Sequence, residues 1–185
     1  MSLTKTPVCN FGEKAKDFKL KSVNNKLVSL NDIKGEKATL IMFICNHCPY
    51  VKAIIKDLIN DCKELKKHGI NSVAIMSNDT KNYPEDSLNN MVKFAKNYQF
   101  EDINYLIDET QEVARNYKAV CTPDFFGYNK NFELQYRGRF RELKDFKPIK
   151  NSDSDLKISM KMIAQTNKGP DEQIPSMGCN IKWIK

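Results

Sequence analysis

Two cysteines separated by two residues are the feature of this sequence best suited to chemistry. Cys45 and Cys48 enclose Asn46 and His47. Thiol–disulfide exchange needs one thiolate that attacks and a second thiol that releases the resulting mixed disulfide. The imidazole of His47, if it lies beside a thiolate, would stabilise the dithiol form and make the disulfide a better oxidant. The spacing therefore predicts a redox-active pair.

Metal binding is the main alternative for the same residues. A structural zinc site normally has a second, similarly spaced pair of ligands, and the other cysteines, at positions 9, 62, 121 and 179, do not supply one. Thiolates also suit Cu(I), so a copper-delivery module that uses Cys45, Cys48 and His47 is a further hypothesis. For the redox hypothesis we expect no cofactor and no metal ligand.

The surrounding pattern places the cysteine pair where a strand becomes a helix. Residues 38–44 form a short apolar run typical of a buried central strand, and apolar residues recur at helical spacing from 51 to 65. A second apolar run at 70–76 completes a strand–helix–strand unit, which requires a parallel pair with a right-handed crossover. The start of the helix should favour negative charge at Cys45, with Cys48 in the first turn as the resolving thiol.

The α/β alternation continues along the chain, and we therefore expect one domain that spans residues 1–185. A β-hairpin follows Pro123, and the tail after residue 170 has no clear pattern. The other predicted elements are a helix capped by Ser87, a strand at 105–107, a helix around 113–117, hairpin strands at 124–128 and 132–137, and a last helix capped by Ser152 or Ser154 and stopped by Gly169–Pro170.

Composition argues against several other classes of protein. The formal charge is +7, but all but four of the 30 basic residues are lysines spread along the chain, and no nucleic-acid reading motif accompanies them. Alternate spacing predicts that Arg137, Arg139 and Arg141 share one face of a strand. No stretch approaches the roughly 20 apolar residues of a membrane span, and the first residues do not look like a secretion signal. We expect a cytoplasmic protein without nucleic-acid or membrane partners.

Two motifs together resemble a known superfamily. Residues 45–50 read Cys-Asn-His-Cys-Pro-Tyr after a buried strand, and residues 121–126 read Cys-Thr-Pro-Asp-Phe-Phe. This combination resembles the thioredoxin-like superfamily, and within it the peroxiredoxin-like redoxins of the AhpC/TSA family, from about Phe18 to residues 178–183. The resemblance implies a thioredoxin-like α/β fold: a central mixed β-sheet flanked by helices, with an N-terminal β extension and a C-terminal tail.

The same resemblance implies roles for individual residues. Cys45 would be the nucleophile and Cys48 the resolving thiol of a thiol–disulfide oxidoreductase. Pro123 would be a cis proline that faces the pair and exposes the backbone of Thr122 for strand-like pairing with a substrate; the alternative is an ordinary trans proline that opens the hairpin. The partners would be protein or small-molecule thiols and disulfides, together with an unidentified electron donor.

Departures from the family patterns limit the possible activities. Thioredoxins that reduce proteins usually have a tryptophan just before the first cysteine and a buried acid six positions before it, where this chain has Ile44 and Thr39. Proton transfer to Cys48 would then lack its usual carboxylate. The proline and threonine with which peroxiredoxins bind peroxide are also missing from the corresponding positions before either cysteine. A thiol-dependent peroxidase with an antioxidant role is therefore the alternative hypothesis.

Two further cysteines are candidates for a redox relay. Cys121 stands two residues before Pro123, and Cys179 stands in the tail, from which it could reach the same region. Either could resolve a disulfide or a sulfenic acid at the cysteine pair. The alternative is that both are small buried apolar residues, which is a common role for a free cysteine and the one we expect for Cys62.

Overall fold

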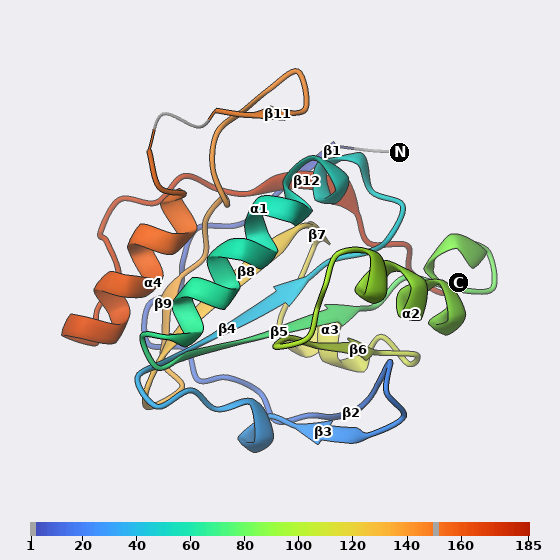
Figure 1. The fold of residues 1–185 in the computed structure, drawn as a ribbon, viewed down its shortest axis with the longest axis horizontal. Helices are drawn as coiled ribbons and strands as arrows, with labels where there is room; N and C mark the ends of the chain where they lie inside the picture. The colour runs from blue at the N-terminus through green and yellow to red at the C-terminus, as the bar shows by residue number, and fades with distance from the viewer. Residues whose placement is uncertain (1–2, 150–151) are drawn as a thin grey trace.

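A mixed β-sheet forms the centre of the protein in a computed structural model that describes residues 3–149 and 152–185 (Figure 1). Its strand order is β3-β2-β6-β5-β4-β8-β9, and the remaining strands form a β1-β12-β7 sheet and a β10-β11 hairpin. The strands are β1 (Leu3–Lys5), β2 (Lys19–Ser22), β3 (Leu27–Ser29), β4 (Ala38–Phe43), β5 (Ile70–Met76), β6 (Asn104–Ile107), β7 (Cys121–Thr122), β8 (Asp124–Asn129), β9 (Leu134–Tyr136), β10 (Leu143–Lys144), β11 (Lys147–Pro148) and β12 (Met177–Asn180). The helices are α1 (Pro49–Lys66), α2 (Leu88–Asn97), α3 (Glu112–Asn116) and α4 (Asp155–Thr166), with short 3-10 turns η1 (Asn31–Ile33) and η2 (Pro84–Asp86).

The predicted strand–helix–strand unit is confirmed. Strands β4 and β5 run parallel, with Ala38 opposite Ile70 and Phe43 opposite Ile75, and α1 makes the crossover between them. Strand β6 extends the parallel pairing, whereas β8 runs antiparallel to β4. The sheet is therefore mixed, as the thioredoxin-like resemblance predicts. The hairpin after Pro123 is also confirmed as β8 and β9.

The two faces of the sheet are covered by different parts of the chain. Leu40 and Met42 of β4 belong to the apolar core under α1, α2 and α4, whereas Ile41 and Phe43 belong to the core under α3 and the N-terminal segments. This alternation follows the two-residue period of a strand. Both faces are buried, which explains why residues 38–44 are an almost unbroken apolar run rather than an alternating one.

One prediction needs correction at the level of the fold. Arg137, Arg139 and Arg141 do not share a strand face, because β9 ends at Tyr136 and each arginine has its own partner: Asp124, Asp155 and the carbonyl of Ile149, respectively.

The last helix is capped by Ser154, one of the two predicted caps, whose hydroxyl accepts a hydrogen bond from the Lys157 amide. It ends before Gly169, with Asn167 in the left-handed conformation.

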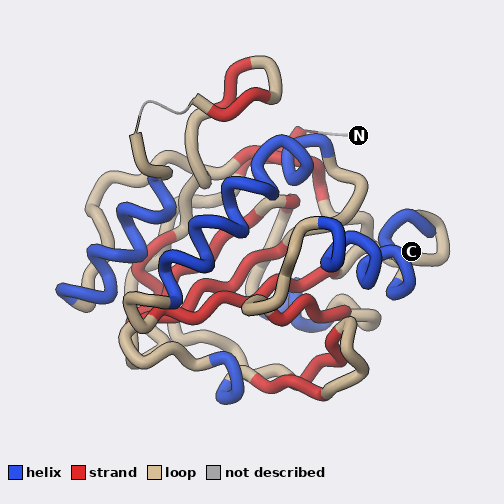
Figure 2. The backbone as a smooth tube through the Cα atoms, viewed as in Figure 1, coloured by secondary structure: helices blue, strands red, loops and turns tan. Residues whose placement is uncertain are grey.

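The tail, for which the sequence made no prediction, crosses back to the start of α1. Strand β12 lies between β1 and β7, so the two ends of the chain form one small sheet (Figure 2). Among the described residues, no helix is both long and apolar enough to cross a membrane.

Candidate active site

The cysteine pair lies at the junction of β4 and α1, as predicted, but Cys48 lies just before the first helical turn and not within it. Cys48 is the N-cap residue and Pro49 is the first helical residue, where its missing amide proton costs nothing. Cys45 precedes the helix by four positions. All six cysteines are free thiols, and both members of the pair are buried, with 1% of Cys45 and none of Cys48 exposed.

The loop of Thr122 and Pro123 faces the pair. The Thr122–Pro123 peptide bond is cis, as the resemblance implied. The Thr122 hydroxyl lies 3.4 Å from the Cys45 sulfur, and the Cys48 thiol donates a hydrogen bond to the Thr122 carbonyl at 3.0 Å. Segments that are more than 70 residues apart in the sequence therefore meet at the two sulfur atoms.

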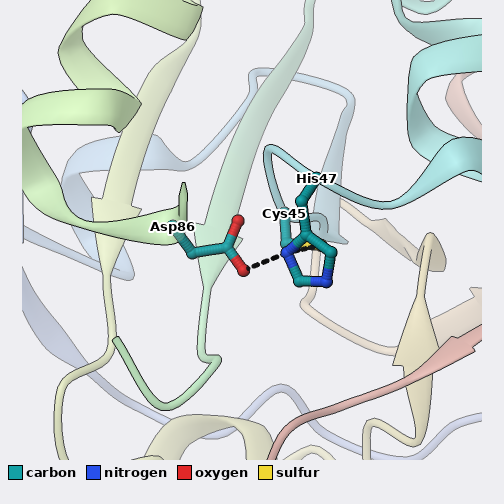
Figure 3. A group of neighbouring side chains, drawn as sticks. All are labelled: Cys45, His47 and Asp86. Carbon is teal, nitrogen blue, oxygen red and sulfur yellow. Dashed lines mark hydrogen bonds and ion pairs between the residues drawn. The ribbon is translucent and has the colours of Figure 1, made fainter. Parts of the chain in front are cut away.

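A buried carboxylate that the sequence did not predict completes the site. Asp86, at the end of η2, accepts a hydrogen bond at 2.7 Å from Nδ1 of His47, and that nitrogen lies 3.9 Å from the Cys45 sulfur (Figure 3). The amide of Asn46 and the side chain of Asn78 also donate to Asp86, each at 2.8 Å. Asp86 is 39 positions from His47, and no local pattern distinguishes it from the other acids of the chain.

Asp86 and His47 stabilise each other's charged form. Burial opposes the ionisation of Asp86, but the hydrogen bonds from His47, Asn78 and the Asn46 amide outweigh it and hold the pKa of Asp86 below its usual value. The hydrogen bond to Asp86 in turn raises the pKa of His47, against a smaller opposing effect of burial. The His47 ring also lies parallel to the Tyr83 ring, with 5.8 Å between centroids. The site therefore favours an imidazolium–carboxylate pair beside Cys45.

The two cysteines have opposite ionisation preferences. The Cys45 thiol donates to the Cys48 sulfur, and this contact, together with burial and the charge of Asp86, raises the pKa of Cys45. The same contact lowers the pKa of Cys48, helped by the backbone amides of Val51 and Cys179. The first turn of α1 thus supports charge on Cys48 and not on Cys45. The expectation that the helix start favours a thiolate at Cys45 is corrected, because the helix begins at Pro49.

Cys45, His47 and Asp86 also carry atoms that could together bind a metal ion, since one ligand atom from each lies within 4.8 Å of the others. Two ligands about 2.0 Å from a tetrahedral zinc ion would lie roughly 3.3 Å apart. The 2.7 Å between His47 and Asp86 is instead the length of a charge-assisted hydrogen bond. The geometry favours a hydrogen-bonded pair over a preformed metal site.

The two candidate relay cysteines occupy different positions. Cys179 of β12 lies directly opposite Thr122 of β7, whereas Cys121 lies opposite Asn180. Burial, the hydrogen bond of the Cys179 thiol to Cys48 and the charge of Cys48 raise the pKa of Cys179 to about 12. The Cys121 sulfur lies 3.5 Å from the Pro123 carbonyl, and its pKa is raised mainly by burial. Cys62 is buried in the core, as predicted.

A cavity of about 440 Å³ adjoins the site on the side of Pro123. Tyr50 and Ile54 of α1 line it, so it begins within the first turn of the helix, two residues after Cys48. Apolar side chains of the β10-β11 hairpin region and the tail supply much of the remaining wall: Phe140, Leu143, Phe146 and Ile174. The basic side chains of Lys5 and Arg141 also line the cavity. This cavity could receive the body of a molecule whose sulfur approaches the cysteine pair.

The fold and the site define the class of this protein as a thioredoxin-like redoxin. The sequence profile of the AhpC/TSA family matches residues 11–142, and the chain belongs to that family. A search of curated proteins finds no match.

Several solved structures are similar to this chain. An uncharacterised conserved protein from Geobacillus kaustophilus is 37% identical, with a TM-score of 0.94 over 100% of this chain and 97% of that chain. A hypothetical protein from Sinorhizobium meliloti is 34% identical, with a TM-score of 0.89 over 98% of each chain. A secreted disulfide oxidoreductase from Mycobacterium tuberculosis, homologous to Escherichia coli DsbE, is 16% identical, with a TM-score of 0.54 over 64% of this chain and 80% of that chain. This last likeness concerns the fold alone.

Proposed function

We propose that this protein is a thiol–disulfide oxidoreductase that uses Cys45 and Cys48 as a dithiol–disulfide pair and forms a mixed disulfide with its substrate. The observation that carries the proposal is the contact between the two sulfurs beside Thr122, with the negative charge favoured on Cys48. A low thiol pKa makes Cys48 a good leaving group, and a stabilised dithiol makes the disulfide an oxidant. The substrates are protein or small-molecule thiols.

The exchange proceeds in two balanced steps. A substrate thiolate attacks the Cys45 sulfur of the disulfide; the bond between Cys45 and Cys48 breaks, and its electron pair leaves on Cys48. A second substrate thiolate then attacks the substrate sulfur of the mixed disulfide, which forms the substrate disulfide and releases Cys45 as a thiolate. The substrate loses two electrons and the protein dithiol gains them. An electron acceptor of the disulfide class restores the starting state.

His47 and Asp86 act on the charge at Cys45. The Nδ1 proton of the imidazolium is held by Asp86, and the ring places its positive charge 3.9 Å from the departing Cys45 thiolate. Asp86 holds the ring in place and raises the pKa of His47, which favours the protonated ring. This pair lies beside Cys45 and does not replace the carboxylate that is missing at Thr39, whose hydroxyl accepts a hydrogen bond from the Gly35 amide.

The test is covalent trapping with a Cys48→Ser variant. After incubation with oxidised glutathione, peptide mass mapping should find glutathione on Cys45, because the resolving sulfur is gone. A Cys62→Ser variant is the matched control and should retain the reversible Cys45–Cys48 disulfide. If Cys45 reacts with an alkylating agent but never forms a mixed disulfide, the proposal is wrong.

Peroxide reduction is the second candidate, favoured by the lowered pKa of Cys48 at the helix N-cap. The Cys48 thiolate would attack a peroxide oxygen, giving a sulfenic acid and releasing an alkoxide or hydroxide; Cys45 would then displace water and form the disulfide. Peroxide consumption far above that of free cysteine, and lost in Cys48→Ser, would favour this function. A rate equal to that of free cysteine would remove it.

A further inference from the structure

The substrate-docking edge suggested by the resemblance is occupied by the protein's own tail. Thr122, next to the cis proline, was expected to pair its backbone with a substrate strand. Instead, β12 lies beside β7 (Figure 1) and runs antiparallel to it, and the register places Cys179 directly opposite Thr122. A Cβ atom on Gly178 would lie 2.1 Å from the Thr122 carbonyl, so the closeness of the two strands depends on a residue without a side chain. The tail thus lies where a substrate strand was expected.

The pairing also decides which cysteine faces the active site. Residues directly opposite each other in an antiparallel pair project to the same face. The side chain of Thr122 projects toward Cys45, and the side chain of Cys179 therefore projects to the same side. Cys121 and Asn180 are the next pair and project to the opposite side.

The contacts of Cys179 end at Cys48. The Cys179 thiol hydrogen-bonds to the Cys48 sulfur, and the Cys179 backbone amide also donates to that sulfur. The contact is buried, with 4% of Cys179 exposed. Cys48 therefore lies between two thiols, Cys45 on the N-terminal side and Cys179 on the tail, and it can pair with either.

We propose that β12 acts as an internal substrate strand and that Cys179 is a third redox cysteine, which exchanges disulfides with Cys48. The inference rests on the proposed oxidoreductase function. In the exchange, the Cys179 thiolate attacks Cys48 in the Cys45–Cys48 disulfide; the new bond joins Cys48 and Cys179, and the electron pair of the broken bond leaves on Cys45. The proton lost by Cys179 is matched by one that Cys45 takes up from solvent. No net oxidation occurs: the disulfide is now held by Cys48 and Cys179, and Cys45 is again a thiol.

Disulfide mapping in a Cys45→Ser variant tests the relay directly. In a glutathione redox buffer, Cys48 attacks oxidised glutathione and releases one glutathione; Cys179 then attacks Cys48 and releases the second. The expected product is an intramolecular Cys48–Cys179 disulfide without bound glutathione. Adding Cys179→Ser should leave Cys48 glutathionylated, whereas adding Cys121→Ser should change nothing. A Cys48–Cys121 disulfide, or glutathione retained on Cys48 with Cys179 intact, would overturn the relay.

A second variant disturbs the strand pairing and leaves every thiol in place. Gly178→Ala should push β12 away from Thr122 and reduce the fraction of Cys48–Cys179 disulfide in the Cys45→Ser background by several-fold. In the otherwise wild-type chain, the same change should leave the Cys45–Cys48 disulfide reversible. Mapping of the wild-type chain separates the two proposals. If the wild-type chain forms the Cys45–Cys48 disulfide but the Cys45→Ser variant forms no Cys48–Cys179 disulfide, the relay alone is removed. If neither disulfide forms, the oxidoreductase is removed as well.

Discussion

The two sides of the cysteine pair stabilise charge by different means. Around Cys45 the polar groups are side chains, the His47–Asp86 pair and the Thr122 hydroxyl. Around Cys48 they include backbone amides, from the first turn of α1 and from β12. The carboxylate beside Cys45 raises the cost of a thiolate there, whereas amides can only donate. The pKa is therefore raised at Cys45 and lowered at Cys48, although the two thiols are only three positions apart. Position in the motif does not by itself decide which cysteine becomes the thiolate.

The largest expected effect comes from removing either sulfur. With Cys45→Ser, Cys48 keeps its amide donors and should titrate below the ordinary thiol pKa of about 8.5; with Cys48→Ser, Cys45 should titrate above it. We expect a difference of at least about two pKa units between the variants. The thiolate absorbance at 240 nm measures both, since burial raises the pKa of each of the other four cysteines. Equal thiol pKa values in the two variants would show that the surroundings of Cys45 and Cys48 do not differ in their effect on thiol ionisation.

Asp86→Asn tests the Cys45 side by itself. The change leaves a buried site with a weaker acceptor for three donors and should cost about 1–3 kcal/mol of unfolding free energy. It should also lower the pKa of His47, because the ring loses the carboxylate that favours its protonated form. NMR titration of the imidazole signals measures this change, with the exposed His68 as the internal control signal. A His47 titration identical to that of wild type would show that Asp86 does not hold the imidazolium.

The His47–Asp86 pair should also produce a pH-dependent stability. The folded state raises the pKa of His47, so the stabilisation is fully present below the unfolded value of about 6.5 and is lost as pH rises through the folded value. A difference of one pKa unit between the folded and unfolded states corresponds to about 1.4 kcal/mol of unfolding free energy. Urea unfolding of wild type and His47→Gln should therefore differ more at pH 6 than at pH 9. A difference that grows with pH would contradict this assignment.

The smallest expected effect concerns Tyr83, which stacks on His47. Tyr83→Leu should cost less than about 1.5 kcal/mol, because ring pairs contribute about 0.5–1.5 kcal/mol beyond their buried area. Tyr83→Phe keeps the ring and is the matched control. Thermal unfolding of the two variants measures the difference, and a large loss in both would mean that the Tyr83 hydroxyl, and not the ring, supports the site.

Local patterns predicted the elements that carry the cysteine pair. Apolar runs and helical spacing depend on neighbouring residues, and β4, α1, β5 and the hairpin appear where those patterns place them. The cis proline was predicted from the resemblance and is present. Pro49 begins α1, as its position suggested, but the amide donors at the helix start reach Cys48 and not Cys45.

The tertiary structure decided everything that depends on pairing between distant segments. Asp86 contacts His47 because η2, which follows β5 in the chain, lies beside the loop that leaves β4. The residues around Asp86 carry no pattern that predicts this contact. Cys179 faces Cys48 because β12 pairs with β7 in one register; a shift of one residue would turn its side chain to the other face. The sequence by itself determined the cysteine pair and its strand-to-helix setting, because those rest on local patterns. Only the folded chain determined that negative charge is favoured on Cys48, that Asp86 is the carboxylate bound to His47, and that Cys179 is the third thiol in contact with Cys48.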